Sequence, residues 1–450
     1  MTTSDLIPGA SVRFSLSGAD PHEEVHVARS LTGPGAGPCF GTLDGFCFDL
    51  GAPSLQASGI ADDFGRVEIT QVLPAHLPIG TPVWFQAVAP RGATGLSWIG
   101  SSVVSATIAE HGTCDNYSLG SESIVSVTDL MFEVAAADFD GDGFEDVVVP
   151  LYVADTLAIY LGDGSGGLTY DGMWGAVEQP TVVQTADMDS NGTEDIVAFG
   201  IRDDLLVLLN DGAGAFFETN HAHQPTWTAV LAVGDLDGDG APDVVASGID
   251  GEVQAWWNDG SGDLSVAGTT WFVHYPSSME VGDVDEDGHA DLAIGHGTGV
   301  TIYPGLGDGT FGASALYDRS TQCGGLLMDD LDGDGHLDLV ATDPYALNVY
   351  LGDGRGGFSS STRQPMSGPG WVKGVDMDED GLQDLIVLEA HTSTAMIFRN
   401  EGAGSFVLQD ELASSGLSAA VGAQLDLAPG RELIMATDDY EIRVAHGECL

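Results

Sequence analysis

The sequence predicts an all-β protein in which a seven-bladed β-propeller follows a small β-sandwich domain. An acidic nine-residue phrase occurs six times between residues 138 and 384. Successive copies start 49, 48, 48, 47 and 46 residues apart, which is the length of one propeller blade. A Gly-rich phrase follows each acidic copy, and apolar β-branched segments lie between the two.

The acidic phrase carries Asp at its first, third, fifth and ninth positions and Gly at its sixth, as in DFDGDGFED. A tight turn of this composition can direct several carboxylate oxygens, and a backbone carbonyl near position seven, toward one point. Carboxylates this close repel one another unless a cation neutralises them. Oxygen ligands in a flexible loop favour Ca²⁺, since Mg²⁺ demands octahedral geometry and zinc prefers His or Cys.

The opening D-x-D-x-D-G also begins the EF-hand loop, but that loop ends with Glu at position twelve between two helices. Here the phrase ends with Asp at nine and runs into strands such as DVVVPLY. A single acidic turn is explained equally well by solvation, whereas six in register favour six Ca²⁺ sites. The residues expected at positions one, three, five, seven and nine are Asp138, Asp140, Asp142, Phe144, Asp146, Asp187, Asp189, Asn191, Thr193, Asp195, Asp235, Asp237, Asp239, Ala241, Asp243, Asp283, Asp285, Asp287, His289, Asp291, Asp330, Asp332, Asp334, His336, Asp338, Asp376, Asp378, Asp380, Leu382 and Asp384.

Two copies depart from the pattern. In the second, Asn191 replaces the fifth-position Asp with a neutral oxygen, so we expect weaker binding there. A seventh copy is hidden in QLDLAPGRELIMAT, where Gln424 and Ala428 replace the first and fifth ligands and Glu432 takes the ninth position. It starts 48 residues after Asp376. The sequence therefore predicts seven blades and six ion sites.

The second phrase, as in IYLGDGSGGL and VYLGDGRGGF, joins an apolar strand to a Gly-rich hairpin turn. No helical pattern follows it, so no phosphate-binding loop is predicted. Alternating DxDxDGxxD loops and GDGxGxF turns resemble the FG-GAP/VCBS repeat family, bacterial relatives of the integrin alpha-subunit propeller, over roughly residues 115–450. The resemblance implies four antiparallel strands per blade, Ca²⁺ in the loop between the first and second strands, and ligand contacts on the opposite face.

The last blade lacks a fourth strand, because YEIRVAHGECL ends the sequence. An unpaired strand would leave an open edge, so we expect residues 117–128 to close the ring. That pairing brings Cys114 near Cys449, and we predict that they form a disulfide. Cys39 and Cys47 bracket a short loop and could form a second disulfide, so that Cys323 would have no cysteine partner. Buried thiols are the alternative for all five cysteines.

Residues 1–112 contain neither phrase, and we assign residues 113–450 to the propeller. Short alternating segments such as SVRFSLS, separated by Gly, Pro and Asp turns, predict a β-sandwich accessory domain in residues 1–112. Calcium and disulfides favour a secreted or cell-surface protein. The opening MTTSDLIPG has no basic or apolar signal region, so we expect that a signal peptide was removed or not included.

The formal net charge is −57, and residues 1–114 hold only 10 of the 69 acidic side chains. Twenty-three aspartates lie in the six loops. Nucleic acid and anionic membranes are therefore poor partners. No apolar run reaches the ~18 residues of a membrane-inserted helix. We expect an extracellular glycan or protein as the partner, and a homo-oligomer or surface assembly is compatible with the sequence.

Loops on the face opposite the acidic phrases contain aromatic and polar side chains suited to a glycan or protein ligand. Packing that caps the blades and plugs the channel is the simpler explanation for the large aromatics. The enzyme signatures GxSxG and CxxC are absent. A recognition or adhesion module is therefore favoured, and the alternative is an extracellular polysaccharide- or ester-cleaving enzyme with its site on that face. The candidate side chains are Trp174, Arg202, His221, His223, Trp227, Trp271, His274, Tyr275, Tyr345, Trp371 and His391.

Overall fold

The computed structural model describes residues 117–449 apart from 201–203, 224–227, 249, 319–321, 427 and 429, and only the strands of residues 1–112. Contacts divide the chain into two compact units, Met1–Gly112 and Thr113–Leu450. Within this described part, every regular element is a strand. The described residues include no helix with the length and apolar character needed to cross a membrane.

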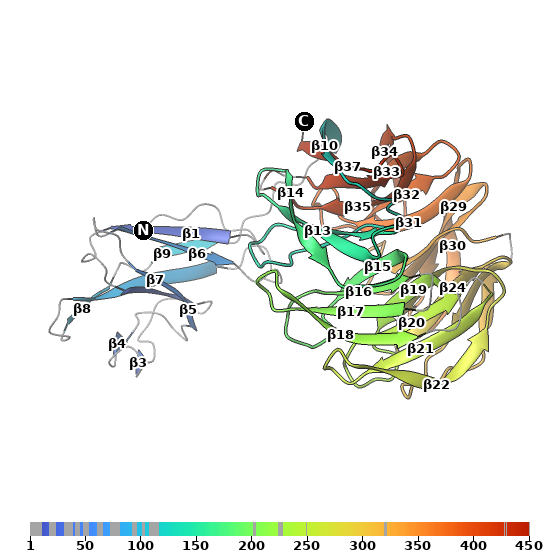
Figure 1. Ribbon diagram of the computed structural model, residues 1–450, viewed down its shortest axis with the longest axis horizontal. Helices are drawn as coiled ribbons and strands as arrows, with labels where there is room; N and C mark the ends of the chain where they lie inside the picture. The colour runs from blue at the N-terminus through green and yellow to red at the C-terminus, as the bar shows by residue number, and fades with distance from the viewer. Residues whose placement is uncertain are drawn as a thin grey trace. The chain divides into compact units, whose positions relative to one another are not determined.

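Seven four-stranded antiparallel sheets form the blades of the propeller in the second unit (Figure 1). In each of the first six blades, four consecutive strands pair in chain order. The strands of blades one to three are β11 (Ala135–Ala137), β12 (Asp146–Leu151), β13 (Thr156–Gly162) and β14 (Leu168–Trp174), then β15 (Pro180–Ala186), β16 (Asp195–Gly200), β17 (Asp204–Asn210) and β18 (Phe216–His223), then β19 (Thr228–Gly234), β20 (Asp243–Gly248), β21 (Glu252–Asn258) and β22 (Leu264–Phe272).

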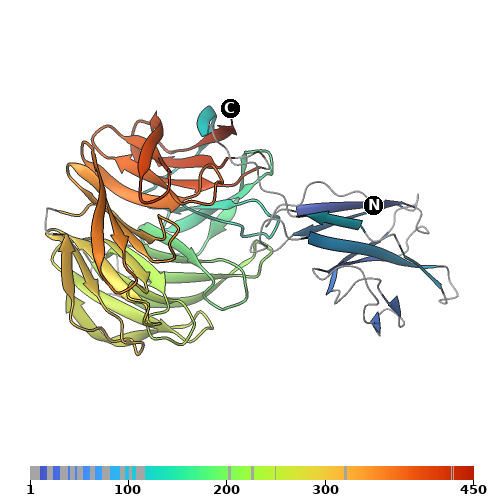
Figure 2. The same cartoon turned by 180° about the vertical axis from the view of Figure 1, so that it is seen from behind.

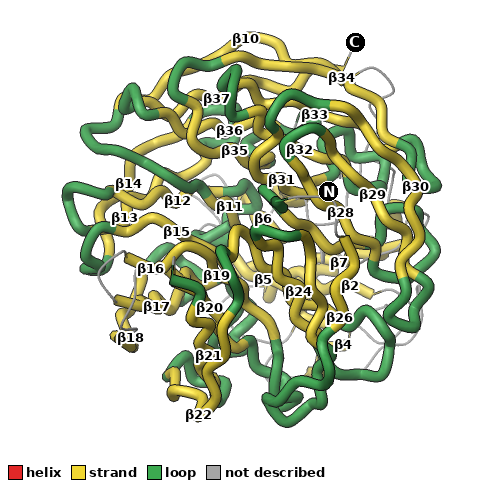
Figure 3. Tube along the Cα trace, turned by 90° about the vertical axis from the view of Figure 1, so that its right-hand side faces the viewer, coloured by secondary structure: helices red, strands yellow, loops and turns green. Residues whose placement is uncertain are grey.

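Blades four to six repeat this meander, and the first strand of each blade lies toward the middle of the ring while the fourth lies at its rim (Figure 3). Their strands are β23 (Pro276–Gly282), β24 (Asp291–His296), β25 (Gly299–Tyr303) and β26 (Ala315–Asp318), then β27 (Leu326–Asp329), β28 (Asp338–Asp343), β29 (Ala346–Gly352) and β30 (Phe358–Pro365), then β31 (Pro369–Val375), β32 (Asp384–Glu389), β33 (Thr394–Asn400) and β34 (Phe406–Ala413).

The seventh blade joins the two ends of the propeller. It contains β35 (Leu417–Ala423), β36 (Glu432–Thr437), β37 (Glu441–Cys449) and, as its outer strand, β10 (Tyr117–Ser126). Figures 1 and 2 show β10 beside β37 at the C-terminal end of the chain. This is the position that the sequence assigns to residues 117–128, and it removes the open edge.

The hydrophobic core is divided among the seven junctions between neighbouring blades. The second strands β12, β16, β20, β24, β28 and β36 are buried along their whole length, because both of their faces pack against other blades. One apolar cluster fills each junction, including the junction of blade seven with blade one. Each blade therefore depends on its neighbours for burial.

The second residue of every acidic phrase belongs to these clusters. Phe139 of blade one packs with blade two, and Leu425 of blade seven packs with blade one. The equivalent residues Met188, Leu236, Val284, Leu331 and Met377 are buried in the junctions between. Each polar loop is thus anchored by one apolar side chain in the core of the next blade.

The described residues of the first unit also form strands. A five-stranded sheet pairs β5, β2, β7 and β8 in that order with β9 on β7, while β1 pairs with β6 and β3 with β4. The bounds are β1 (Ser11–Ser17), β2 (Glu24–Ser30), β3 (Cys39–Phe40), β4 (Phe46–Cys47), β5 (Ser54–Ile60), β6 (Arg66–Val72), β7 (Pro82–Arg91), β8 (Ser97–Gly100) and β9 (Val104–Thr107). The sandwich arrangement of these sheets remains a prediction.

The cysteines lie mostly outside the described side chains. The backbone places Cys39 opposite Cys47 in the β3–β4 ladder. Cys114 and the side chain of Cys449 are not among the described residues, so both disulfides remain predictions. Cys323 is buried, and its thiol donates to the carbonyl of Gly325 at 3.3 Å.

Candidate metal centres

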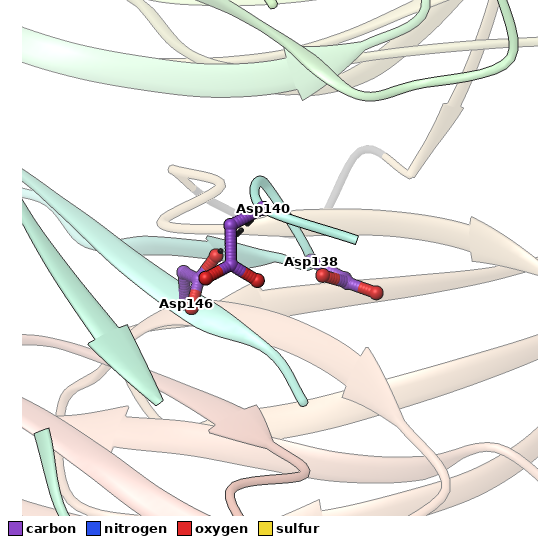
Figure 4. A group of neighbouring side chains, drawn as sticks. All are labelled: Asp138, Asp140 and Asp146. Carbon is purple, nitrogen blue, oxygen red and sulfur yellow. Dashed lines mark hydrogen bonds between the residues drawn. The ribbon is translucent and has the colours of Figure 1, made fainter. Parts of the chain in front are cut away.

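Each of the six acidic phrases forms the loop between the first and second strands of a blade, on one face of the ring. Side-chain oxygens of the first, third and ninth positions converge in four of the loops, within 4.8 Å of one another. Figure 4 shows Asp138, Asp140 and Asp146 of the first loop in this arrangement. In the third loop the converging group is instead Asp235, Asp237 and Asp239.

Backbone N–H groups hold the first-position carboxylate in place. Asp138 accepts from Gly141 at 2.8 Å and from Gly143 at 3.0 Å. The sixth-position glycines all have φ between 88° and 95°, a conformation that other residues rarely adopt. They are Gly143, Gly192, Gly240, Gly288, Gly335 and Gly381.

The third and fifth carboxylates are held in the same way. Asp140 accepts from the N–H of Asp142 at 3.1 Å, and Asp142 accepts from the N–H of Phe144 at 2.9 Å. The sequence predicts the fifth position as a ligand in all six loops. Among the converging groups named above, only that of the third loop includes the fifth-position carboxylate. The predicted contact of an ion with the position-seven carbonyl remains a prediction.

The ninth-position carboxylate has a structural role that sequence reasoning missed. Asp146 Oδ2 accepts from the N–H of Phe139 at 2.8 Å, and Oδ1 accepts from the N–H of Gly162 at 2.9 Å at the end of the third strand. The same two hydrogen bonds recur in the other five loops at Asp195, Asp243, Asp291, Asp338 and Asp384. This buried side chain therefore ties the loop to the third strand of its own blade.

Burial makes these carboxylates hard to ionise. Desolvation raises the pKa of Asp146, Asp243 and Asp384 to about 7, and that of Asp195 and Asp338 to about 6. Neighbouring carboxylates add to the rise, while the backbone N–H groups partly oppose it. A bound cation would reverse this balance by favouring the ionised form.

The residues present fit Ca²⁺. The converging donors are all carboxylate oxygens, they are held by backbone hydrogen bonds, and they are desolvated. The side chain of His336 at position seven lies apart from this function, because its Nδ1 contacts the Glu286 carboxylate of the preceding blade. These loops could hold calcium, which would supply the positive charge that lets the aspartates stay ionised.

The second loop differs as the sequence indicates. The Asn191 amide accepts from the N–H of Thr193 at 2.8 Å and donates from Nδ2 to the carbonyl of Asn210 at 2.9 Å. Its oxygen is neutral, so this loop offers an ion one negative charge fewer than the third loop. Weaker binding at this site remains our prediction.

We expect the ion-free protein to become less stable as the pH rises from about 4 to about 7. The ninth-position carboxylates have a higher pKa folded than their usual value near 4, so the folded state loses its advantage as they ionise. Melting curves in EDTA at pH 5 and pH 8 measure this. Calcium should remove the trend, and a melting temperature in EDTA that rises with pH would contradict it.

The Gly-rich hairpins connect neighbouring blades on the same face. The N–H of Gly214 in blade two donates to the Phe139 carbonyl of blade one at 3.0 Å, and the N–H of Gly356 in blade five donates to the Val284 carbonyl of blade four at 3.0 Å. In three blades, the side chain of an Asn at the end of the third strand donates to a backbone carbonyl of the previous blade. This carbonyl belongs to the second residue of that blade's acidic phrase. These are Asn210 to Phe139 at 2.9 Å, Asn258 to Met188 at 2.7 Å and Asn400 to Leu331 at 2.8 Å.

We expect Asn258→Ala to lower the free energy of unfolding by about 2 kcal/mol. The substitution leaves the buried carbonyl of Met188 and the N–H of Gly262 without their partner. Urea unfolding in saturating calcium measures the loss, with Thr169→Ala on the exposed face of β14 as the control. Equal stability of the two variants would show that the Asn bridge contributes nothing.

Comparisons with known proteins agree with this geometry. The pattern of the FG-GAP-like repeat matches residues 138–198, 187–246, 235–294 and 330–377. The chain therefore contains FG-GAP-like repeats, which build a seven-bladed β-propeller. No curated protein matches the sequence.

Solved structures share the fold at low sequence identity. The BBS1N chain in a crystal structure of BBS1N in complex with ARL6DN, soaked with lead, has a TM-score of 0.53 and 11% identity, with 74% of this chain and 97% of that chain covered. The same complex soaked with mercury has a TM-score of 0.51 and 12% identity, with 73% of this chain and 95% of that chain covered. A lectin from Agrocybe aegerita that recognises non-reducing terminal N-acetylglucosamine has a TM-score of 0.47 and 18% identity, with 89% of this chain and 93% of that chain covered.

Proposed function

We propose that this protein is a secreted, calcium-stabilised recognition module that binds an extracellular glycan or protein on the face opposite the acidic loops. Exposed aromatic side chains on that face carry the proposal. Tyr275 and Phe132 lie in connections between blades, and Tyr345 and Tyr440 lie in turns between second and third strands. All four are at least 45% exposed, and such amphipathic rings suit sugar stacking or a protein ligand.

Backbone strain at two of these tyrosines supports the proposal. Tyr275 and Tyr440 have φ of 56° and 65°, a left-handed conformation that is unfavourable for a bulky side chain. Because both side chains are largely exposed, packing offsets little of this strain. Retained strain of this kind is typical of functional positions.

The other candidate side chains divide into two groups. Trp174 packs against Phe216, Trp271 packs against Tyr303 and Phe311, and Trp371 donates from Nε1 to the Ser418 carbonyl at 3.0 Å. These contacts favour a packing role for the three tryptophans, which is the simpler of the two explanations given for the large aromatics. His274 and His391 are exposed and remain candidates. The side chains outside the described residues are those of Arg202, His221, His223 and Trp227.

An apolar groove of about 590 Å³ opens between blades five and six. Met366, Met396 and Phe398 contribute to its lining, and Pro365 to Ser367 bring one end of it to the face where Tyr345 lies. The N–H of Met366 donates to the Tyr345 carbonyl at 2.9 Å, which ties the groove to that tyrosine. An apolar side chain beside a stacking ring is a common combination in ligand sites.

Charge and location narrow the class of ligand. The anionic surface, with 69 acidic against 12 basic side chains, disfavours nucleic acid and anionic membranes. Millimolar calcium outside cells would keep loops of moderate affinity filled. BBS1N, which has the same fold, forms a complex with ARL6DN, so propellers of this shape can bind proteins.

A glycan array and a panel of purified extracellular proteins, each with calcium and with EDTA, test the proposal. Tyr275→Asn and Tyr345→Ala should reduce binding at least about fivefold, since removing an aromatic anchor costs more than about 1 kcal/mol. Tyr170→Ala, on the exposed rim strand β14, is the matched control. Asn tolerates positive φ, so Tyr275→Asn should fold normally. Binding unchanged by both substitutions would place the ligand elsewhere.

Two charged side chains on the inner strands favour the second candidate, an extracellular polysaccharide- or ester-cleaving enzyme. Lys373, the only lysine of the chain, lies on the inner strand β31 with Nζ 3.7 Å from Glu133 Oε1. Burial raises the pKa of Glu280 on inner strand β23 to about 7, and Lys373 opposes this rise. A carboxylic acid near neutrality beside an ammonium group is suited to proton transfer. Hydrolysis of a polysaccharide or ester panel that Glu280→Gln abolishes would favour this enzyme over the binding module.

A further inference from the structure

The seventh loop keeps the shape of the acidic loops but replaces their charges. Gln424, Asp426 and Ala428 stand where the other loops carry the first, third and fifth ligands. The loop still meets the blade in the same way, because Glu432 Oε2 accepts from the N–H of Leu425 at 2.8 Å. The other oxygen of Glu432 is buried and has no hydrogen-bond partner among the described residues. The seventh loop therefore keeps one of the two hydrogen bonds that the ninth-position carboxylate accepts in the other loops.

The side chain of Gln424 makes contacts of the opposite polarity to those of Asp138. Its Nε2 donates to the carbonyl of Asp426 at 2.8 Å and to the carbonyl of Ala428 at 3.2 Å. In the first loop, the equivalent carboxylate only accepts hydrogen bonds from the backbone. The amide thus presents the positive end of its dipole to loop oxygens, as a cation would.

A second positive group joins this loop to the first blade. The Arg431 guanidinium donates to both oxygens of Glu145, at 3.0 and 2.8 Å. Two hydrogen bonds lie alongside: the Glu145 N–H donates to the Gln424 carbonyl at 2.8 Å, and the Gln424 N–H donates to the Glu145 side-chain oxygen Oε2 at 2.9 Å. Arg–carboxylate pairs bound through both oxygens are among the stronger ion pairs.

Arg431 also contacts the two remaining neighbours through its backbone. Its N–H donates to the Met377 carbonyl of blade six at 2.9 Å, and its carbonyl accepts from the Tyr117 hydroxyl of the closing strand β10 at 2.8 Å. Tyr117 is only 2% exposed. One residue therefore links blade six, blade one and the strand that closes the ring.

We propose that the seventh loop is a cation-independent clasp in which the N–H groups of the neutral Gln424 amide and the charged Arg431 guanidinium take the place of the divalent ion that the other six loops would bind. The ring then stays closed when divalent ions are removed, while blades one to six loosen. The clasp concerns ring closure and is independent of the ligand that the opposite face binds.

Hydrogen exchange of the full chain, with calcium and with EDTA, tests the clasp without any substitution. Amides of β10 and β37 should change their exchange rates less than about threefold in EDTA, whereas those of the first and second strands of blades one to six should exchange at least about tenfold faster. Equal acceleration in all seven blades would overturn the proposal.

Two variants extend the test. Arg431→Met should make β10 exchange faster in EDTA, and Arg363→Met, which removes an ion pair with Asp343 within blade five, is the matched control. Gln424→Asp combined with Ala428→Asp should create a seventh ion site, measured as bound calcium per chain by native mass spectrometry. Seven ions on the unmodified chain, or six on this double variant, would show that Gln424 does not take the place of an ion.

Discussion

Chelating divalent ions is expected to lower the melting temperature by at least about 15 °C. An ion that binds only the folded state at 100 times its dissociation constant adds about 2.7 kcal/mol, and six loops multiply that term. The emptied carboxylates also repel one another at close range, with their oxygens within 4.8 Å. Because a chain of this size shifts by roughly 1 °C per kcal/mol, the six terms together account for a shift of this size.

Differential scanning calorimetry in calcium and in EDTA measures this shift. EDTA saturated with calcium beforehand is the control for effects of the chelator itself. Magnesium in place of calcium should restore only part of the difference, since it accepts the flexible oxygen cage poorly. The same melting temperature in EDTA and in calcium would mean that the acidic loops are solvated turns.

Asp243→Ala is expected to lower the free energy of unfolding by about 3–6 kcal/mol, even without calcium. Its carboxylate accepts from three buried or half-buried N–H groups, those of Leu236 at 2.9 Å, Asp237 at 3.2 Å and Asn258 at 2.9 Å. Removing the side chain leaves these donors unpaired and separates the loop from the third strand. This effect adds to any loss of ion binding.

Two companions of Asp243→Ala separate the structural role from the ligand role, with urea unfolding in calcium and in EDTA as the measurement. Asp239→Ala removes an exposed carboxylate that accepts one backbone hydrogen bond, from the N–H of Ala241 at 2.9 Å, so its cost should be much larger in calcium than in EDTA. Asp243→Asn keeps an acceptor oxygen and should be better tolerated than Asp243→Ala in EDTA. If Asp243→Ala cost nothing in EDTA, Asp243 would act only through the ion.

The spacing of the acidic phrase was sufficient to predict the architecture. A repeat of 46–49 residues with β-branched segments leaves few alternatives to a blade, and the expectation that residues 117–128 close the ring follows from the need to cover an open strand edge. The strand β10 opposite β37 meets that requirement. Local sequence was also sufficient to locate the loops, because Gly at position six permits the turn that lets carboxylates converge.

The contacts between distant residues could not be predicted. Asp146 reads as one more ligand in the sequence, and its hydrogen bond to Gly162 depends on how the third strand returns to the loop. Phe139 carries no signal beyond being apolar, yet it anchors the loop in the next blade. Likewise, Gln424 reads as a lost ligand, and only the direction of its amide shows what replaces the ion.

The amount of calcium bound per chain tests the central claim most directly. Native mass spectrometry after dialysis into calcium should find six ions on the unmodified protein, with the second loop the first to empty as calcium is lowered. Asp237→Ala should bind five ions, and Asp426→Ala, in the loop without an acidic cage, should still bind six. A chain that binds no calcium at millimolar concentration would contradict the account.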